Sequence, residues 1–73
     1  MKATYDKTAD AMYISVKGGK VHKTLEVSDA INVDVDKNGR ALGVEILYVS
    51  SHMPRKSIKE TLRTGIPVSA VVV

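Results

Sequence analysis

The sequence predicts an α+β fold: an antiparallel sheet of four to five short strands, arranged as a β-hairpin meander, followed by one C-terminal α-helix. Eleven Val and five Ile outnumber four Leu and three Met, and β-branched side chains favour strands. Apolar and polar residues alternate in several short runs over the first two thirds of the chain. This period of two is typical of a strand with one buried face.

Three short strands are expected in the first half of the chain. Residues 2–5 precede a polar turn at 6–10, and residues 12–17 alternate clearly between apolar and polar side chains. The pair Gly18-Gly19 then predicts a tight hairpin into a third strand over residues 21–27, where the alternation is weaker.

The next hairpin is specified best, because Asn38-Gly39 suits a two-residue type I′ turn in which both residues have positive φ. In that register every apolar residue of one strand faces an apolar residue of the other. The expected pairs are Lys37 with Arg40, Val35 with Leu42, Val33 with Val44, and Ile31 with Ile46.

The C-terminal third has a different pattern. Ser50 or Ser51 could cap a helix whose main part is residues 55–64, and Gly65 with Pro67 just beyond marks its end. Ile58 and Leu62 form a narrow apolar stripe on this helix. Residues 68–73 favour a final short strand. We therefore expect one domain over residues 1–73, with a sheet at 1–50, a basic helix at 51–65 and an apolar tail strand at 66–73.

Composition excludes several classes of function. The chain has no cysteine, which rules out a disulfide framework, a thiolate metal site and a cysteine nucleophile. No apolar run approaches the ~18 residues of a membrane span, and no basic-then-apolar leader opens the sequence. A cytoplasmic protein without a membrane partner is the expectation.

The net charge of +3 belongs entirely to the C-terminal part of the chain. Residues 1–50 carry seven basic and seven acidic side chains, whereas residues 51–73 carry four basic ones against Glu60. A compact basic helix can contact nucleic acid or an acidic protein. Alternatively, it is a solvated helix face whose long side chains shield a small apolar stripe. The candidate partner-binding residues are Arg55, Lys56, Lys59 and Arg63.

One motif matches the calcium-binding loop of EF-hands in full: Asp34, Asp36, Asn38, Gly39 and Glu45. That loop needs a helix on each side, whereas both flanks here alternate with the period of strands. Ala41 also replaces the usual aliphatic residue at the eighth loop position. We therefore interpret these residues as the polar face and turn of a hairpin, and we expect no bound metal.

No catalytic constellation emerges from the other polar residues. His22 and His52 have no neighbours at metal-ligand spacing, and no Gly-rich phosphate loop is present. The serines suit caps and turns. The sequence predicts a protein that is not an enzyme and needs no cofactor.

Two motifs in order resemble the YuzE-like family of small bacterial and archaeal proteins of unknown function. They are Tyr5-Asp6 with residues 9–14, and Asp34 and Gly39 with residues 42–47 and Ser50. The resemblance covers about residues 2–50 and implies an antiparallel sheet with a C-terminal helix. It also makes an antitoxin-like role conceivable. Ala30 stands where the family tends to have Gly, and the basic helix and tail extend past the matched region.

Two functional hypotheses follow. The leading one is a non-enzymatic protein-interaction module that forms a homo-oligomer, because a small core and an apolar tail strand favour association between chains. The tail could instead complete the sheet of its own chain. The alternative hypothesis is binding of nucleic acid or an acidic partner through the basic helix. The candidate oligomer contacts are Val68, Ala70, Val71, Val72 and Val73.

Overall fold

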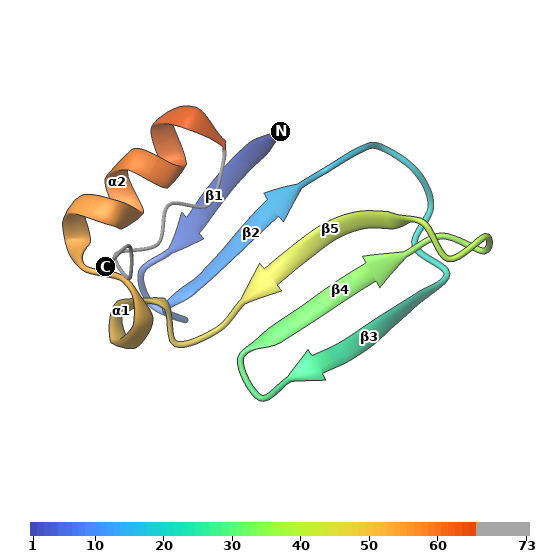
Figure 1. The fold of residues 1–73 in the computed structure, drawn as a ribbon, viewed down its shortest axis with the longest axis horizontal. Helices are drawn as coiled ribbons and strands as arrows, with labels where there is room; N and C mark the ends of the chain where they lie inside the picture. Colours follow the sequence, from blue (N-terminus) through green and yellow to red (C-terminus); the bar gives the residue numbers. More distant parts are fainter. Residues whose placement is uncertain (66–73) are drawn as a thin grey trace.

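A computed structural model describes residues 1–65, which form a five-stranded antiparallel sheet with two helices at one side of it (Figure 1). The elements in chain order are β1 (Lys2–Asp6), β2 (Ala11–Ser15), β3 (Lys23–Ser28), β4 (Ile31–Val35), β5 (Ala41–Ile46), α1 (Val49–His52) and α2 (Arg55–Thr64). The expected α+β class is confirmed. The expected tail strand lies outside the described residues. Neither α1 nor α2 is long and apolar enough to cross a membrane.

The strand order across the sheet is β1-β2-β5-β4-β3, so the last strand of the sequence lies in the middle of the sheet (Figure 1). The hairpin expected at Gly18-Gly19 is therefore wrong, because β2 pairs with β1 and β5 and not with β3. The expected meander, in which strands follow one another in sequence order, is wrong for the same reason. Residues 16–22 instead connect the two distant strands. In this connection Gly19 packs so closely on Leu42 that an added Cβ would lie 3.0 Å from the leucine side chain.

Apolar pairing accounts for the central place of β5. On β2, Met12 faces Ile46 and Ile14 faces Val44, and both β2 side chains are buried. Cross-strand pairs of this kind stabilise a sheet by about 0.2–1 kcal/mol each. In a hairpin with β3, the apolar side chains of β2 would have faced residues 21–27, where apolar and polar residues alternate less regularly.

The β4–β5 hairpin has the expected strand partners near its open end. Ile31 faces Ile46 and Val33 faces Val44, which confirms that part of the predicted register. A register shift follows Asp34, so that the next β4 residue, Val35, faces Ala41. The predicted pairing of Val35 with Leu42 is therefore wrong.

The shift arises because the turn is a three-residue loop over residues 37–39 and not the expected two-residue loop. The Asp36 N–H donates to the Arg40 carbonyl and the Gly39 N–H to the Asp36 carbonyl, both at 3.0 Å. The Asp36 carboxylate also accepts the N–H groups of Asn38 and Arg40 at 2.8 and 2.9 Å. Gly39 has φ 81°, the left-handed conformation that such a loop requires at its last position.

The helix expected at residues 55–64 is confirmed as α2, and Gly65 ends it in a left-handed conformation. The caps differ from the prediction. Neither Ser50 nor Ser51 caps a helix, since Tyr48 precedes α1 and Pro54 precedes α2. The short helix α1 was not expected. It ends at an extended residue before Pro54 because the position preceding a proline disfavours the helical conformation.

The main core lies between the helices and the β1–β2 side of the sheet. It consists of Met12, Ile14, Val49, Met53 and Ile58. The buried face of α2 is formed by Ser57, Ile58 and Thr61, while Leu62 remains 39% exposed. Of the predicted apolar stripe, Ile58 is buried as expected, whereas Leu62 is not. The α2 helix is turned so that Thr61 is buried and Leu62 lies at the edge of the core.

The opposite face of the sheet carries a hydrogen-bonded row of polar side chains. The Tyr13 hydroxyl on β2 donates to Asp34 on β4 at 3.0 Å, and Thr24 on β3 donates to the same carboxylate at 2.5 Å. The Tyr13 ring reaches Asp34 by crossing Gly43 of β5, where an added Cβ would overlap its hydroxyl. Burial and the hydrogen bond to Asp34 raise the pKa of Tyr13.

Replacing Gly43 by Ala is expected to lower the free energy of unfolding by about 1–3 kcal/mol, because the Tyr13 ring must leave its position over β5. Urea denaturation measures this change. Gly18→Ala is the matched control, since an added Cβ there meets no atom within 4 Å. In a Tyr13→Ser background the cost of Gly43→Ala should largely vanish. An equal cost in both backgrounds would contradict the explanation.

Candidate partner-binding site

The carboxylate of Asp10 ties the helices to the turn between β1 and β2. Asp10 accepts the Tyr5 hydroxyl at 2.6 Å and the Ser50 hydroxyl at 2.7 Å. It also accepts the Ser50 N–H at 3.0 Å, and its backbone carbonyl accepts the N–H of Val49 at 3.1 Å. Asp10 and Ser50 are far apart in sequence, so these bonds attach the segment that follows β5 to the β1–β2 turn.

These bonds favour the ionised form of Asp10. Hydrogen bonds from Tyr5 and then Ser50 lower the pKa of Asp10 below its ordinary value. The same contact raises the pKa of Tyr5, because the phenol must keep its proton to donate. Asp10 has φ 53°, a left-handed conformation that Asp and Asn tolerate better than most residues. Together these contacts give the Ser50 hydroxyl a structural role.

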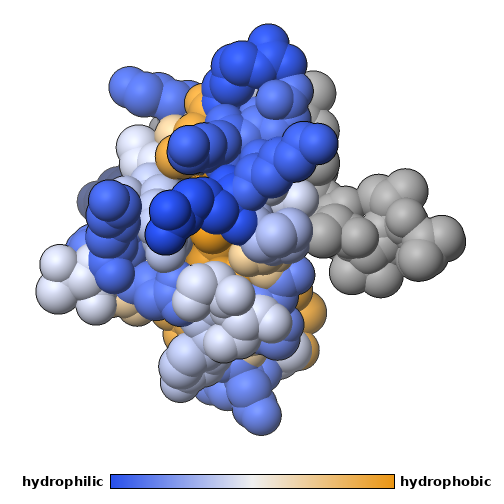
Figure 2. All heavy atoms as spheres, turned by 90° about the vertical axis from the view of Figure 1, so that its left-hand side faces the viewer, coloured by the Kyte–Doolittle hydropathy of each residue, from blue (hydrophilic) through white to orange (hydrophobic). Residues whose placement is uncertain are grey.

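A groove runs beside this anchor, between the β1–β2 turn and the two helices. We call it the helix groove; its volume is about 770 Å³. Hydrophilic side chains cover most of this face of the molecule, and a hydrophobic strip is visible between them (Figure 2). The apolar lining consists of Tyr5, Met53, Pro54, Ile58 and Leu62, and the polar lining consists of Lys7, Ser50, Arg55 and Lys59.

The structure separates the four basic residues proposed from the sequence. Arg55 and Lys59 line the helix groove, whereas Lys56 and Arg63 do not. Arg63 instead forms an ion pair with Glu60 on the same helix, and this contact lowers the pKa of Glu60. Two of the four proposed residues therefore line the groove, and the other two do not.

Lys7 is the basic groove residue that the sequence did not indicate as a partner-binding residue. It lies in the β1–β2 turn, far in sequence from α2, yet it lines the same groove as Arg55 and Lys59. A lysine in a short polar turn is not by itself a binding residue. Lys7 joins the groove only because α2 packs against β1, and the local sequence does not show that packing.

A second candidate surface is the part of the apolar, core-side sheet face that lies beyond the helices, over β4 and β3. Residues 31, 33 and 44 share a face with the core residues Met12 and Ile14 through successive cross-strand pairs. Within residues 1–65, the helices lie at the β1–β2 side, and none lies over β3 or β4 (Figure 1). On the edge strand, Leu25 is 42% and Val27 62% exposed.

The carboxylates of the calcium-like motif point to different protein partners. Asp34 binds Tyr13 and Thr24 on the polar sheet face, and Asp36 binds backbone N–H groups of the turn. Glu45 accepts the Asn32 side-chain amide at 3.1 Å. These contacts give each acidic residue a structural role in the hairpin, as interpreted from the sequence. Hydrogen bonds from the Arg40 and Asn38 N–H groups lower the pKa of Asp36.

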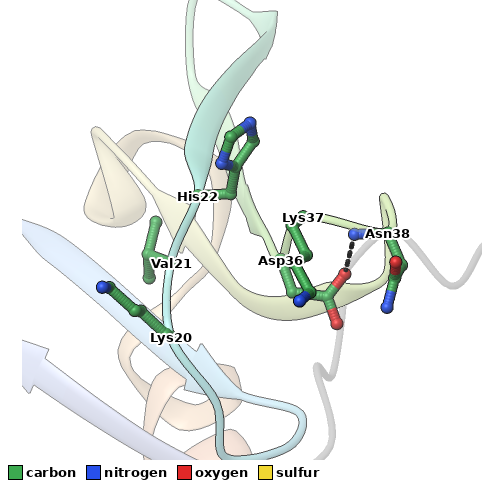
Figure 3. Close-up of a pocket in the computed structure, with 6 residues that line it drawn as sticks. All are labelled: Lys20, Val21, His22, Asp36, Lys37 and Asn38. Carbon is green, nitrogen blue, oxygen red and sulfur yellow. Dashed lines mark hydrogen bonds between the residues drawn. The ribbon is translucent and has the colours of Figure 1, made fainter.

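His22 lies in a smaller hollow of about 390 Å³ between the segment before β3 and the β4–β5 turn. Asp36 and Asn38 line the other side, but the His22 ring and the Asp36 carboxylate point away from each other (Figure 3). His52 is exposed in α1. In the described part of the chain, no three His, Cys, Asp or Glu side chains are grouped closely enough to hold a metal ion.

Comparison with known proteins relates the sheet to other chains. A family model described as "Protein of unknown function (DUF2283)" matches residues 2–50, the part that contains all five strands and Ser50. An uncharacterized protein of Methanocaldococcus jannaschii, MJ0789, is 38% identical over 50 residues. The match covers 68% of this chain and 42% of that protein, so the chain spans less than half of its relative. No solved structure matches.

Replacing Asp10 by Asn is expected to lower Tm at neutral pH and to make Tm less sensitive to acid. The folded pKa lies below the ordinary value of 3.8. The ionised carboxylate therefore stabilises the fold above that pH, and this contribution is lost as pH falls through the folded pKa. Thermal unfolding followed by circular dichroism from about pH 7 to about pH 2 measures the difference.

Asn keeps the left-handed backbone at this position, so the variant mainly removes the charge. Asp29→Asn, in the exposed turn between β3 and β4, is the matched control and should follow the wild-type pH profile. If Asp10→Asn also followed the wild-type profile, the anchor would not depend on the ionised carboxylate.

Proposed function

The chain belongs to the DUF2283 family of proteins of unknown function, and we propose that it is a non-enzymatic protein-interaction module that forms a homodimer through strand β3. The observation that carries this proposal is the exposure of Leu25 and Val27 on an edge strand beside an apolar face that no described helix covers. The second copy of the chain is the proposed occupant of this edge.

The size of the core supports association. The main cluster contains five buried side chains, and Val35 and Leu42 are the other buried apolar residues of the described chain. A chain of this length buries only ~60% of its unfolded surface and is marginally stable alone. Covering Leu25 and its half-buried neighbour Val33 would remove further apolar surface from water, at ~25 cal/mol per Å².

The edge itself supports self-pairing. All six residues of β3 are exposed, and the outer side of an edge strand offers N–H and C=O groups to another strand. An antiparallel pair of β3 strands centred on Leu25 places Thr24 opposite Glu26, on the regular part of β3 before the register shift between Glu26 and Ser28. No like charges then face each other, and a two-fold axis keeps both apolar faces on the same side of the combined sheet.

A non-enzymatic role is supported by how the polar side chains are engaged. The Asp10, Ser50 and Asp34 side chains hold the helices and the sheet together. The YuzE-like assignment, the antitoxin-like role and the cytoplasmic location remain predictions from the sequence. The tail residues Val68, Ala70, Val71, Val72 and Val73 lie outside the described residues, so their part in an oligomer also remains a prediction.

Replacing Leu25 by Glu is expected to convert the homodimer to a monomer, because a charge then lies at the centre of the proposed strand pair. Light scattering coupled to size exclusion measures the native mass, which should halve. The variant should also lose the rise of Tm with protein concentration that a dimer shows.

Thr4→Glu is the matched control, since Thr4 is exposed on the other edge strand, β1. It should leave the mass unchanged. A wild-type protein that is monomeric at high concentration contradicts the proposal. An unchanged mass for Leu25→Glu also contradicts it, and a mass that falls only on removal of residues 67–73 would assign association to the tail.

A further inference from the structure

We propose that the helix groove is a docking site for an acidic, leucine-rich peptide segment of a partner protein. The proposal goes beyond the homodimer, because the groove lies beside β1 and the dimer contact lies on β3, at the opposite edge of the sheet (Figure 1). Each can therefore be tested without the other.

The lining of the groove has two complementary parts. Leu62 is 39% exposed although it belongs to the helix that covers the core, and the largely buried Met53 and Ile58 form the floor beside it. Lys7 and Lys59 add cationic groups from opposite walls, one from the β1–β2 turn and one from α2. A peptide whose apolar side chains are flanked by carboxylates would match both parts, with the apolar side chains on the floor and the carboxylates at the lysines.

The charges at the groove lack acidic partners within it. Arg55 and Lys59 lie one helical turn apart, so they line the same side of α2. No acidic residue lines the groove among the described residues. The Asp10 carboxylate does not line the groove and accepts hydrogen bonds from Tyr5 and Ser50, which do. Three cations over an apolar floor thus favour a negatively charged occupant.

Charge argues against the chain's own tail as that occupant. Residues 66–73 contain no acidic side chain, so they offer Lys7, Arg55 and Lys59 no carboxylate side chain.

The composition of the floor favours a peptide over nucleic acid. Sequence-tolerant binding of single strands uses aromatic side chains on which bases stack. Tyr5 is the one aromatic residue among the groove residues, and its hydroxyl is held by Asp10. Aliphatic side chains such as Ile58 and Leu62 suit the apolar anchors of a peptide.

Fluorescence anisotropy tests the proposal with a set of short fluorescein-labelled peptides that covers the possible orders of leucine and glutamate. At low salt at least one peptide should bind with a Kd below about 1 mM, and added salt should weaken binding. Peptides with serine in place of leucine, or lysine in place of glutamate, should bind at least about fivefold more weakly.

Matched double variants locate the site. Arg55→Gln with Lys59→Gln should weaken binding about five- to tenfold, whereas Lys56→Gln with Arg63→Gln should change it less than about twofold. Both pairs remove two positive charges from α2, and circular dichroism checks that each variant is folded. Leu62→Ser should also weaken binding.

Four results would overturn the proposal. They are the absence of binding by every peptide, equal losses in the two double variants, tighter binding of a labelled thymidine oligonucleotide than of any peptide, and a marked gain in affinity on removal of residues 66–73. The last result would identify the tail as the occupant. None of these results bears on the dimer, whose readout is the native mass.

Discussion

The ionised carboxylate of Asp10 is the interaction on which the arrangement of the molecule depends. By accepting hydrogen bonds from Tyr5 and Ser50, it holds the chain that leaves β5 against the turn between β1 and β2. The α1 and α2 helices must then lie at that side of the sheet. This placement explains why Met12 and Ile14 are covered by Val49, Met53 and Ile58, and why the far strands receive no such cover from the helices.

Two surfaces follow from this one-sided placement. Where α2 meets the β1–β2 turn, Lys7 is brought beside Arg55 and Lys59 over an apolar floor. At the other side, the apolar face continues past the core to the exposed side chains of β3. A chain with longer helices could bury that face itself. Here α2 is ten residues long, about 15 Å at 1.5 Å per residue, and it reaches only part of the sheet.

Local sequence patterns were sufficient for the five strands and for α2, but not for α1 or for the arrangement of the elements. Alternation placed the strands, and Gly65 marked the end of α2, because the faces of a strand and the glycine that ends a helix are set by neighbouring residues. The central place of β5 depends on which distant strand offers Met12 and Ile14 the better partners, which no local pattern records. The three-residue turn was missed because the Asp36 side chain competes for the N–H groups of the loop.

For the candidate sites too, the sequence indicates individual residues but not which of them lie together. The basic residues of α2 were visible in the sequence, but the Glu60 contact of Arg63 and the joining of Lys7 to the groove required the packing of α2 on β1. The calcium-like motif is the opposite case, because its sequence spacing suggests a site that the structure does not form. Its residues match a known spacing, yet Asp34, Asp36 and Glu45 make separate contacts along a hairpin. Spacing identifies a site only when the backbone brings the side chains together.

The central claim is that the helices leave β3 uncovered and that a second copy of the chain pairs with it. Amide hydrogen exchange of the full chain at high and low protein concentration tests this claim most directly. We predict that the amides of Lys23–Ser28 that point away from β4 exchange slowly at high concentration and faster on dilution, while the amides of Lys2–Asp6 do not change. Fast exchange in β3 at every concentration would contradict it.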